Sequence, residues 1–220
     1  MANAGERQSP LVLSYLALRQ TVGWVALLLP FALVIPWYFV GHGAVESSIS
    51  SYYYTGMRNL LVGSLCAIGM FNLCCRGYDW QDEAAGIASA IFAIGVAFFP
   101  VAPDVGATPF QQHISIAHYT FATLLFVTLA IFCLVLFQKS AGTMTRRKKL
   151  RNAWYRVCGW VIVASLVTLG WFKLSGGHDR PGHWGVTFTF ETTSLVAFGF
   201  AWLIKGETFL KDEGSETNRG

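Results

Sequence analysis

Charged residues are scarce in this chain. Asp, Glu, Lys and Arg make up 13% of its 220 residues, and apolar residues make up 54%. Soluble domains carry about a quarter charged residues, so a soluble globular protein is excluded as the main architecture. Six long apolar runs account for the difference. The length is enough for one helical membrane domain and for no second globular domain.

Several signals of other protein classes are also missing. The net charge of +4 comes from basic residues gathered beside the membrane, so we expect no nucleic-acid partner. None of the five cysteines falls in an expected outer loop, which argues against structural disulfides. The first apolar run, Thr21 to Val40, is longer than the apolar region of a usual signal peptide, and no small-residue cleavage site follows it. We therefore expect it to be a retained helix.

The apolar runs predict an all-α bundle of six transmembrane helices. We expect a cytoplasmic lead at residues 1–17, a membrane domain at 18–205 and a disordered cytoplasmic tail at 206–220. The helices are expected at about 18–40, 59–75, 84–102, 113–137, 154–173 and 184–204. Small residues recur every four positions along 84–102, which allows close helix approach and predicts a central place for that helix.

The basic residues predict the orientation. With six helices, thirteen of the 16 Lys and Arg residues fall on the side of the two termini, seven of them between Lys139 and Arg156. Cytoplasmic loops of membrane proteins are enriched in Lys and Arg, so both termini are predicted to be cytoplasmic. We expect a multi-pass protein of the cell membrane, which is the inner membrane in a Gram-negative cell.

One carboxylate interrupts the last apolar run. Glu191 lies within Trp184 to Ile204, and helical spacing places Thr187 and Ser194 on its face. An ionisable group at membrane depth is costly and usually faces a protein interior, where it carries a function or pairs with another polar group. His118 falls at a similar depth in its own helix. The sequence therefore predicts an outward-facing polar pocket around Glu191 and His118.

The residues expected to line this pocket are polar or aromatic and come from the outer loops and helix ends: Glu46, Ser48, Tyr53, Arg58, Ser115, Thr187 and Ser194. The interpretation that we favour is a non-catalytic membrane module that binds a lipid or a protein partner, with membrane lipids as its surroundings. In that interpretation Glu191 is a structural polar anchor, hydrogen-bonded to Arg58, a tyrosine hydroxyl or a helix end. The sequence does not indicate an oligomeric state.

The alternative is a metal-dependent hydrolase that acts on a lipid ester or amide. His118, His183 and Glu191 would bind a divalent metal such as zinc, with His113 or Asp104 as replacements, and Glu191 and His118 would be catalytic. The HxxxH, HExxH and CxxC spacings of common metal sites are absent. Haem bound by paired histidines is a further alternative.

The serines of the outer loop make a serine hydrolase another class to consider. Ser48, Ser50 and Ser51 lie close together in it, but the chain has no GxSxG motif. We interpret these serines as helix caps or as contacts to lipid headgroups.

Two stretches carry a family resemblance. SSISSYYYTGMRNLLVG (Ser47 to Gly63) and FETTSLVAFGFAWLIKG (Phe190 to Gly206) resemble a group of uncharacterised bacterial multi-helix membrane proteins. The resemblance covers most of the chain and implies no activity. More loosely, the Ser/Glu segment and the outer histidines are similar to the membrane hydrolase superfamily of alkaline ceramidases and adiponectin receptors. Those proteins have seven helices and an HxxxH in the last one, so no metal ligand is carried over to this chain.

Overall fold

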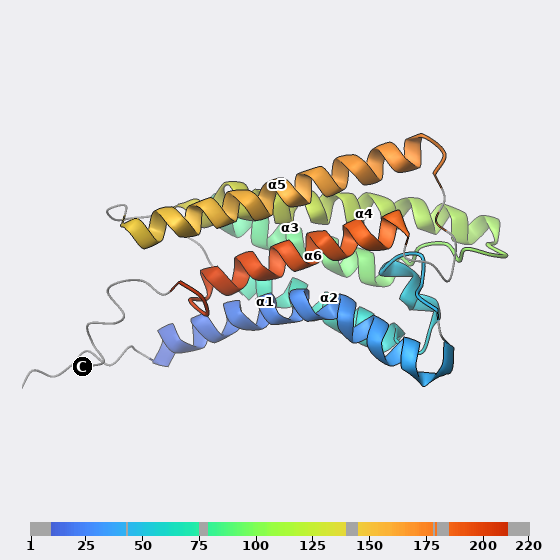
Figure 1. Ribbon diagram of the computed structural model, residues 1–220, viewed down its shortest axis with the longest axis horizontal. Helices are drawn as coiled ribbons and strands as arrows, with labels where there is room; N and C mark the ends of the chain where they lie inside the picture. The colour runs from blue at the N-terminus through green and yellow to red at the C-terminus, as the bar shows by residue number, and fades with distance from the viewer. Residues whose placement is uncertain are drawn as a thin grey trace, which may run out of the picture.

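The computed structural model describes residues 10–42, 44–74, 79–139, 145–177, 179 and 185–210. These ranges contain six α-helices and no strand (Figure 1). The helices are α1 (Pro10–Trp37), α2 (Arg58–Cys74), α3 (Trp80–Phe98), α4 (Pro109–Leu134), α5 (Arg146–Leu174) and α6 (Val186–Lys205). Short helical turns lie at Tyr38–His42, Ser50–Tyr54 (η2) and Leu136–Gln138. The predicted all-α class is confirmed, whereas most of the predicted lead and tail lies outside these ranges.

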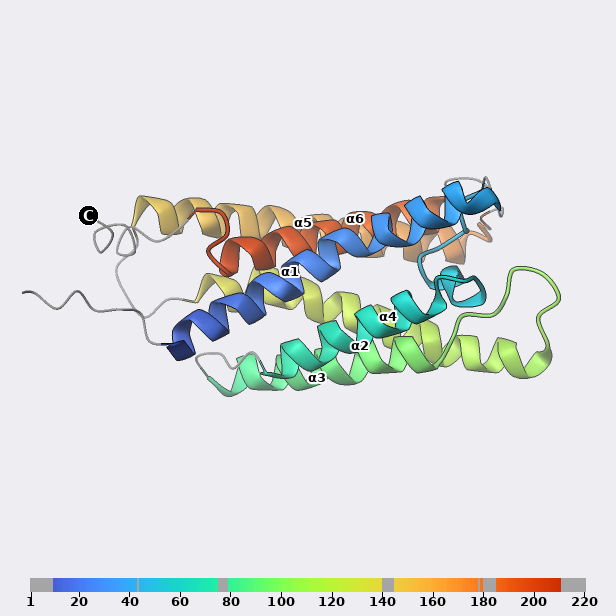
Figure 2. The same ribbon diagram turned by 90° about the horizontal axis from the view of Figure 1, so that it is seen from below.

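The six helices form a closed ring. Each packs against its neighbours in the chain, and α6 returns to pack against α1 (Figure 2). A smaller contact joins α4 to α6 across the ring. The helix predicted to be central, at 84–102, is not: α3 packs mainly against α2 and α4, and α6 has the largest buried share of the long apolar helices. Bulky buried side chains of α6, such as Phe188, Phe198 and Trp202, fill the interior instead.

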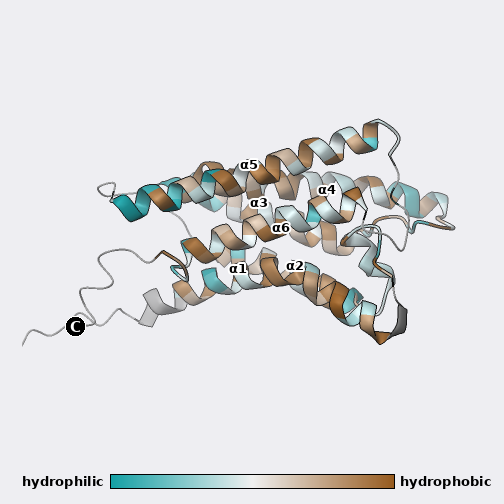
Figure 3. Cartoon of the chain, in the orientation of Figure 1, coloured by the Kyte–Doolittle hydropathy of each residue, from teal (hydrophilic) through white to brown (hydrophobic). Residues whose placement is uncertain are grey.

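Length and apolar composition make this a membrane-type bundle. Five helices are long and apolar enough to cross a membrane, namely α1, α3, α4, α5 and α6, while the described part of α2 has 17 residues. Apolar residues cover the middle of the helices, and polar residues gather at the start of α5 (Figure 3). α1 runs through Pro30 and changes to a π-helix after Trp37.

Three helices begin earlier than their apolar runs because a polar side chain caps each one. Asp79 caps α3 and Thr108 caps α4, each in a reciprocal capping box with the residue three positions later. Thr145 caps α5 by accepting a hydrogen bond from the Lys148 amide. Caps satisfy backbone amides that the first turn leaves free, so these helices extend beyond the apolar segment.

Small residues bring α2 and α3 together. A Cβ atom added to Gly86 would lie 2.9 Å from the Asn72 carbonyl oxygen, and one added to Gly69 would lie 3.3 Å from that of Ala90. These backbones therefore touch without intervening side chains. The small-residue pattern of 84–102 therefore marks a close contact with the α2 backbone, and Gly95 of the same helix leaves room for the Phe121 ring of α4.

One end of the bundle holds the first turns of α1 and α5 and the last turn of α6, and we call it the terminal end (Figure 1). The opposite end holds η2, and we call it the loop end. At the terminal end Lys139 Nζ bonds both Asp79 carboxylate oxygens at 2.8 and 2.9 Å and lies 3.4 Å from Asp82. The Lys139 hydrogen bond holds the pKa of Asp79 below its ordinary value of 3.8. Lys139 thus ties the segment after α4 to the cap of α3.

This ion pair predicts a loss of stability in acid. Because the pKa of Asp79 is lower in the folded protein, its contribution is complete above the unfolded value of 3.8 and is lost as the pH falls through the lower folded value. The thermal unfolding midpoint of the detergent-solubilised protein should therefore drop as the pH falls below about 4. Lys139→Met should lower the midpoint at neutral pH and make this drop smaller. Lys149→Met, at an exposed position of the same end, is the control; an equal acid drop in Lys139→Met would contradict the assignment.

Candidate functional site

The segment between α1 and α2 folds into the loop end. Ser47, Ser48, Ser51 and Tyr52 are buried there, and η2 carries the last two of them. The Tyr52 ring lies 6.4 Å from that of Phe188 on α6, and burial raises the pKa of Tyr52 to about 12. This segment is therefore part of the folded interior.

Glu191 holds this segment in place. Its Oε2 accepts a hydrogen bond from the Ile49 backbone amide at 2.8 Å, just before η2 begins. The Phe188 amide donates to the Ser47 carbonyl oxygen at 3.2 Å, so two successive turns of α6 bind the same segment. A hydrogen bond to a charged group contributes about 1.5–3 kcal/mol. Glu191 thus acts as an anchor for the backbone of the serine segment.

Four polar side chains form a series of hydrogen bonds in which the donor of each bond can be assigned. The Ser47 hydroxyl donates to Asp104 Oδ2 at 2.7 Å, so across the 3.0 Å contact between Ser47 and Ser51 it is Ser51 that donates. Ser51 then has no second proton to give, and Ser48 donates to it at 2.8 Å. The three hydroxyl groups are therefore all oriented toward the Asp104 carboxylate.

His118 faces this segment from α4. Its Nδ1 lies 2.7 Å from the Phe99 carbonyl oxygen, which can only accept, so Nδ1 carries the proton. In the neutral ring Nε2 is then an acceptor, and it lies 3.0 Å from the Ser50 hydroxyl. Ser50 therefore donates to Nε2. The His118 side chain is 3% exposed, so the pair is shielded from bulk water on the helix side.

A second carboxylate organises the start of α6. Asp179 Oδ1 accepts from the Val186 amide at 2.7 Å, and Oδ2 accepts from the Thr187 amide at 2.9 Å. Gly185, at the N-cap position, has no side chain to do this. A negative charge at a helix N-terminus is favourable, so Asp179 stabilises the start of α6 beside the cavity.

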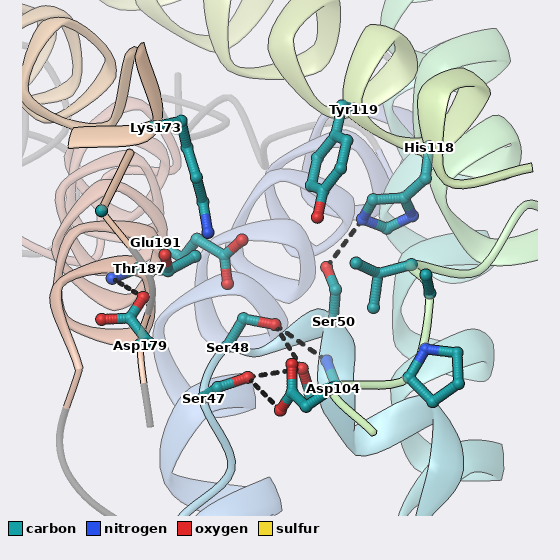
Figure 4. A pocket seen from close by; sticks show the side chains of 15 residues that line it. Ser47, Ser48, Ser50, Asp104, His118, Tyr119, Lys173, Asp179, Thr187 and Glu191 are labelled. Carbon is teal, nitrogen blue, oxygen red and sulfur yellow. Dashed lines mark hydrogen bonds between the residues drawn. The ribbon is translucent and has the colours of Figure 1, made fainter. Parts of the chain in front are cut away.

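These groups surround a cavity of about 350 Å³ at the loop end (Figure 4). Lys173 points its amino group toward Glu191, and the Tyr119 hydroxyl points toward the space beside the His118–Ser50 pair. Thr187 also lines the cavity, and its buried Oγ1 has no hydrogen-bond partner within the described part of the chain. The polar lining residues are Ser47, Ser48, Ser50, Ser51, Asp104, His118, Tyr119, Lys173, Asp179, Thr187 and Glu191.

The structure gathers some of the predicted pocket residues and separates others. Ser48, His118, Thr187 and Glu191 line the cavity. Tyr53 instead lines a smaller neighbouring hollow shared with Ser50 and His118. The remaining predicted lining residues do not border the cavity: Glu46, Arg58, Ser115 and Ser194.

Arg58 contacts Tyr53 and does not line the cavity. Its guanidinium lies 4.1 Å from the centre of the Tyr53 ring and donates to the Tyr53 hydroxyl. Tyr53, five residues earlier in the chain, therefore contacts the guanidinium that was one of three predicted partners of Glu191.

The sequence prediction did not include Tyr119, Lys173 or Asp179 in the pocket. Lys173 is the last basic residue of α5, and Asp179 precedes α6 by a few residues, so both lie at helix ends of the outer side. That position was the available signal. It did not show that the segment between α1 and α2 lies against the end of α5 and the start of α6.

The predicted metal ligands divide between described and undescribed residues. His183 lies outside the described residues. Within them, no three His, Cys, Asp or Glu side chains come together as a metal-binding group. The His113 ring bonds the Pro109 carbonyl oxygen of its own helix at 2.7 Å. The zinc hypothesis thus stays a prediction from sequence.

No family model, curated protein or solved structure matches the chain. The resemblances seen in the sequence therefore stay expectations. The chemistry of the cavity residues is the basis on which a function can be proposed.

The anchoring role of Glu191 predicts a local effect on hydrogen exchange. Glu191→Ala leaves the Ile49 amide without its acceptor, a loss of about 1–3 kcal/mol. Amide exchange over residues 47–54 should accelerate about tenfold or more, whereas Glu191→Gln, which keeps an acceptor oxygen, should have a smaller effect. Thr189→Ala, on the exposed face of the same helix, is the control. Unchanged exchange at Ile49 in Glu191→Ala would rule out the anchor.

Proposed function

We propose that this is a multi-pass protein of the cell membrane that binds the polar headgroup of a lipid in the cavity at the loop end. The cavity carries the proposal. Its volume of about 350 Å³ lies in the range of small-molecule sites, and its wall contains a cation and carboxylates. The buried Thr187 hydroxyl lacks a partner within the described chain and supplies a hydrogen-bonding group for a ligand.

The charges favour a zwitterionic headgroup. Lys173 is exposed and suits a phosphate oxygen, whereas Asp104 and Glu191 suit an ammonium group. Asp104 accepts a hydrogen bond from Ser47, and Glu191 accepts one from Ile49, so each carboxylate is held in position. A phosphoethanolamine headgroup carries both charges at a separation that one small cavity can span. Glu191 serves this function as an anchor and as a negative charge, with no chemical step assigned to it.

The orientation proposed is that both termini face the cytoplasm. The basic residues between Lys139 and Arg156 belong to the terminal end, and η2 with the cavity lies at the other end. Lys and Arg concentrate on the cytoplasmic side of membrane proteins. The cavity is then reached from the outer leaflet.

Headgroup binding is tested with defined lipids. Native mass spectrometry of the purified protein in detergent should show binding of short-chain phosphatidylethanolamine in preference to phosphatidylglycerol. Lys173→Met should weaken both by about tenfold, because a hydrogen bond to a charged group contributes about 1.5–3 kcal/mol. Asp104→Asn should weaken only the zwitterionic lipid. Lys149→Met, at the terminal end, should bind as the wild type does; equal binding by all four proteins would refute the proposal.

The orientation has its own test. In a background without native cysteines, Val105→Cys should react with a membrane-impermeant maleimide added to intact cells, and Lys149→Cys should react only after permeabilisation. Both positions are exposed, and Val105 is 83% exposed, so access to the reagent depends on the side of the membrane. The reverse pattern would place the termini outside.

A further inference from the structure

One pair of cavity residues has a geometry that headgroup binding does not require. Ser50 Oγ and His118 Nε2 lie 3.0 Å apart, within the distance of a nucleophile and its general base. The two residues come from η2 and α4 and are 68 positions apart in the chain, so the fold alone brings them together.

The backbone sets the protonation of the pair. The Phe99 carbonyl oxygen accepts the Nδ1 proton of His118 at 2.7 Å, which leaves the Nε2 lone pair directed at the Ser50 hydroxyl. In serine hydrolases a third group performs this task by holding the histidine in one tautomer. Here a main-chain carbonyl, fixed by the end of α3, does the same.

Ser50 differs from the three serines beside it. Ser47, Ser48 and Ser51 donate their hydroxyl protons within the series of hydrogen bonds that ends at the Asp104 carboxylate. Ser50 instead donates its proton to His118 Nε2. All four serines line the cavity, but Ser50 is half-buried whereas its three neighbours are buried. It is thus the serine that combines activation by a histidine with access to a ligand.

We propose that Ser50 is a catalytic nucleophile and His118 its general base, and that the pair hydrolyses a carboxylic ester of a lipid. The choice of a lipid ester rests on the proposed headgroup binding, which brings the glycerol esters of such a lipid to the cavity rim. The nucleophile itself rests only on the geometry of the pair.

The positions of Ser50 Oγ and His118 Nε2 define the steps of the proposed ester hydrolysis. Ser50 Oγ forms a bond to the ester carbonyl carbon as its proton passes to His118 Nε2. The tetrahedral intermediate then breaks its bond to the alcohol oxygen, which takes the proton from Nε2 and leaves as the lysolipid. Water attacks the acyl-Ser50 ester with His118 again accepting the proton, and the fatty acid departs as Ser50 is reprotonated. The Tyr119 hydroxyl, which points into the space beside the pair, is the donor placed to stabilise the oxyanion (Figure 4).

Activity-based labelling tests the nucleophile directly. The full-length protein in detergent should react with a long-chain alkyl fluorophosphonate, and mass spectrometry of the digested protein should place the adduct on Ser50. Ser50→Ala should abolish labelling, and His118→Gln should slow it by about 100-fold or more, the scale of general base catalysis. Ser175→Ala removes an exposed serine at the same end of the bundle and should label at the wild-type rate.

Folding and binding are measured on the same proteins. Thermal unfolding midpoints, together with phosphatidylethanolamine binding, show whether the Ser50 and His118 variants keep the fold. An unlabelled wild-type protein, or an adduct on another serine, overturns the proposal even when lipid binding is intact. Labelling of Ser50 in a protein that binds no phosphatidylethanolamine leaves the nucleophile standing and refutes the headgroup proposal instead.

Discussion

The hydrogen bond from the Ile49 amide to Glu191 is the contact on which the loop end depends. It joins the segment between α1 and α2 to a helix 142 residues later in the chain. Without it, this segment would be held to the first turns of α6 by the Phe188–Ser47 backbone hydrogen bond and by the contact of the Tyr52 and Phe188 rings. Ser50 follows Ile49 directly, so the same bond determines where the Ser50 hydroxyl lies relative to His118.

This arrangement gives the carboxylate within the apolar helix α6 a structural reason. A backbone amide and a carboxylate are each costly to bury without a hydrogen-bond partner, and pairing them offsets part of both costs. The Asp179 carboxylate does the same for two amides at the start of α6. Two of the acidic residues of the cavity, Glu191 and Asp179, therefore hold backbone segments of the cavity wall in place.

The two ends of the bundle use their polar residues differently. At the terminal end, Lys139 binds Asp79 and Gln81, and the Lys148 side chain donates to the Lys139 carbonyl oxygen. These contacts hold helix ends together. At the loop end, the serines, His118 and Lys173 surround a space large enough for a ligand. The proposed function therefore belongs to the loop end, whereas the described polar contacts of the terminal end join helix ends.

The sequence by itself determined the class of the protein. A long apolar run predicts a helix without any knowledge of the segments that pack against it. The sequence therefore predicted the six helices and showed that Glu191 interrupts the last apolar run. The starts of α3, α4 and α5 were missed by several residues because caps such as Thr145 act through single hydrogen bonds that apolar periodicity does not record. Only the tertiary structure decided the partners: Ile49 for Glu191, Tyr53 for Arg58 and Ser50 for His118. The Glu191 and His118 contacts connect segments that are distant in the chain. The donor to Glu191 is a backbone amide, which every residue except proline possesses, so no residue pattern in the sequence could have marked this bond.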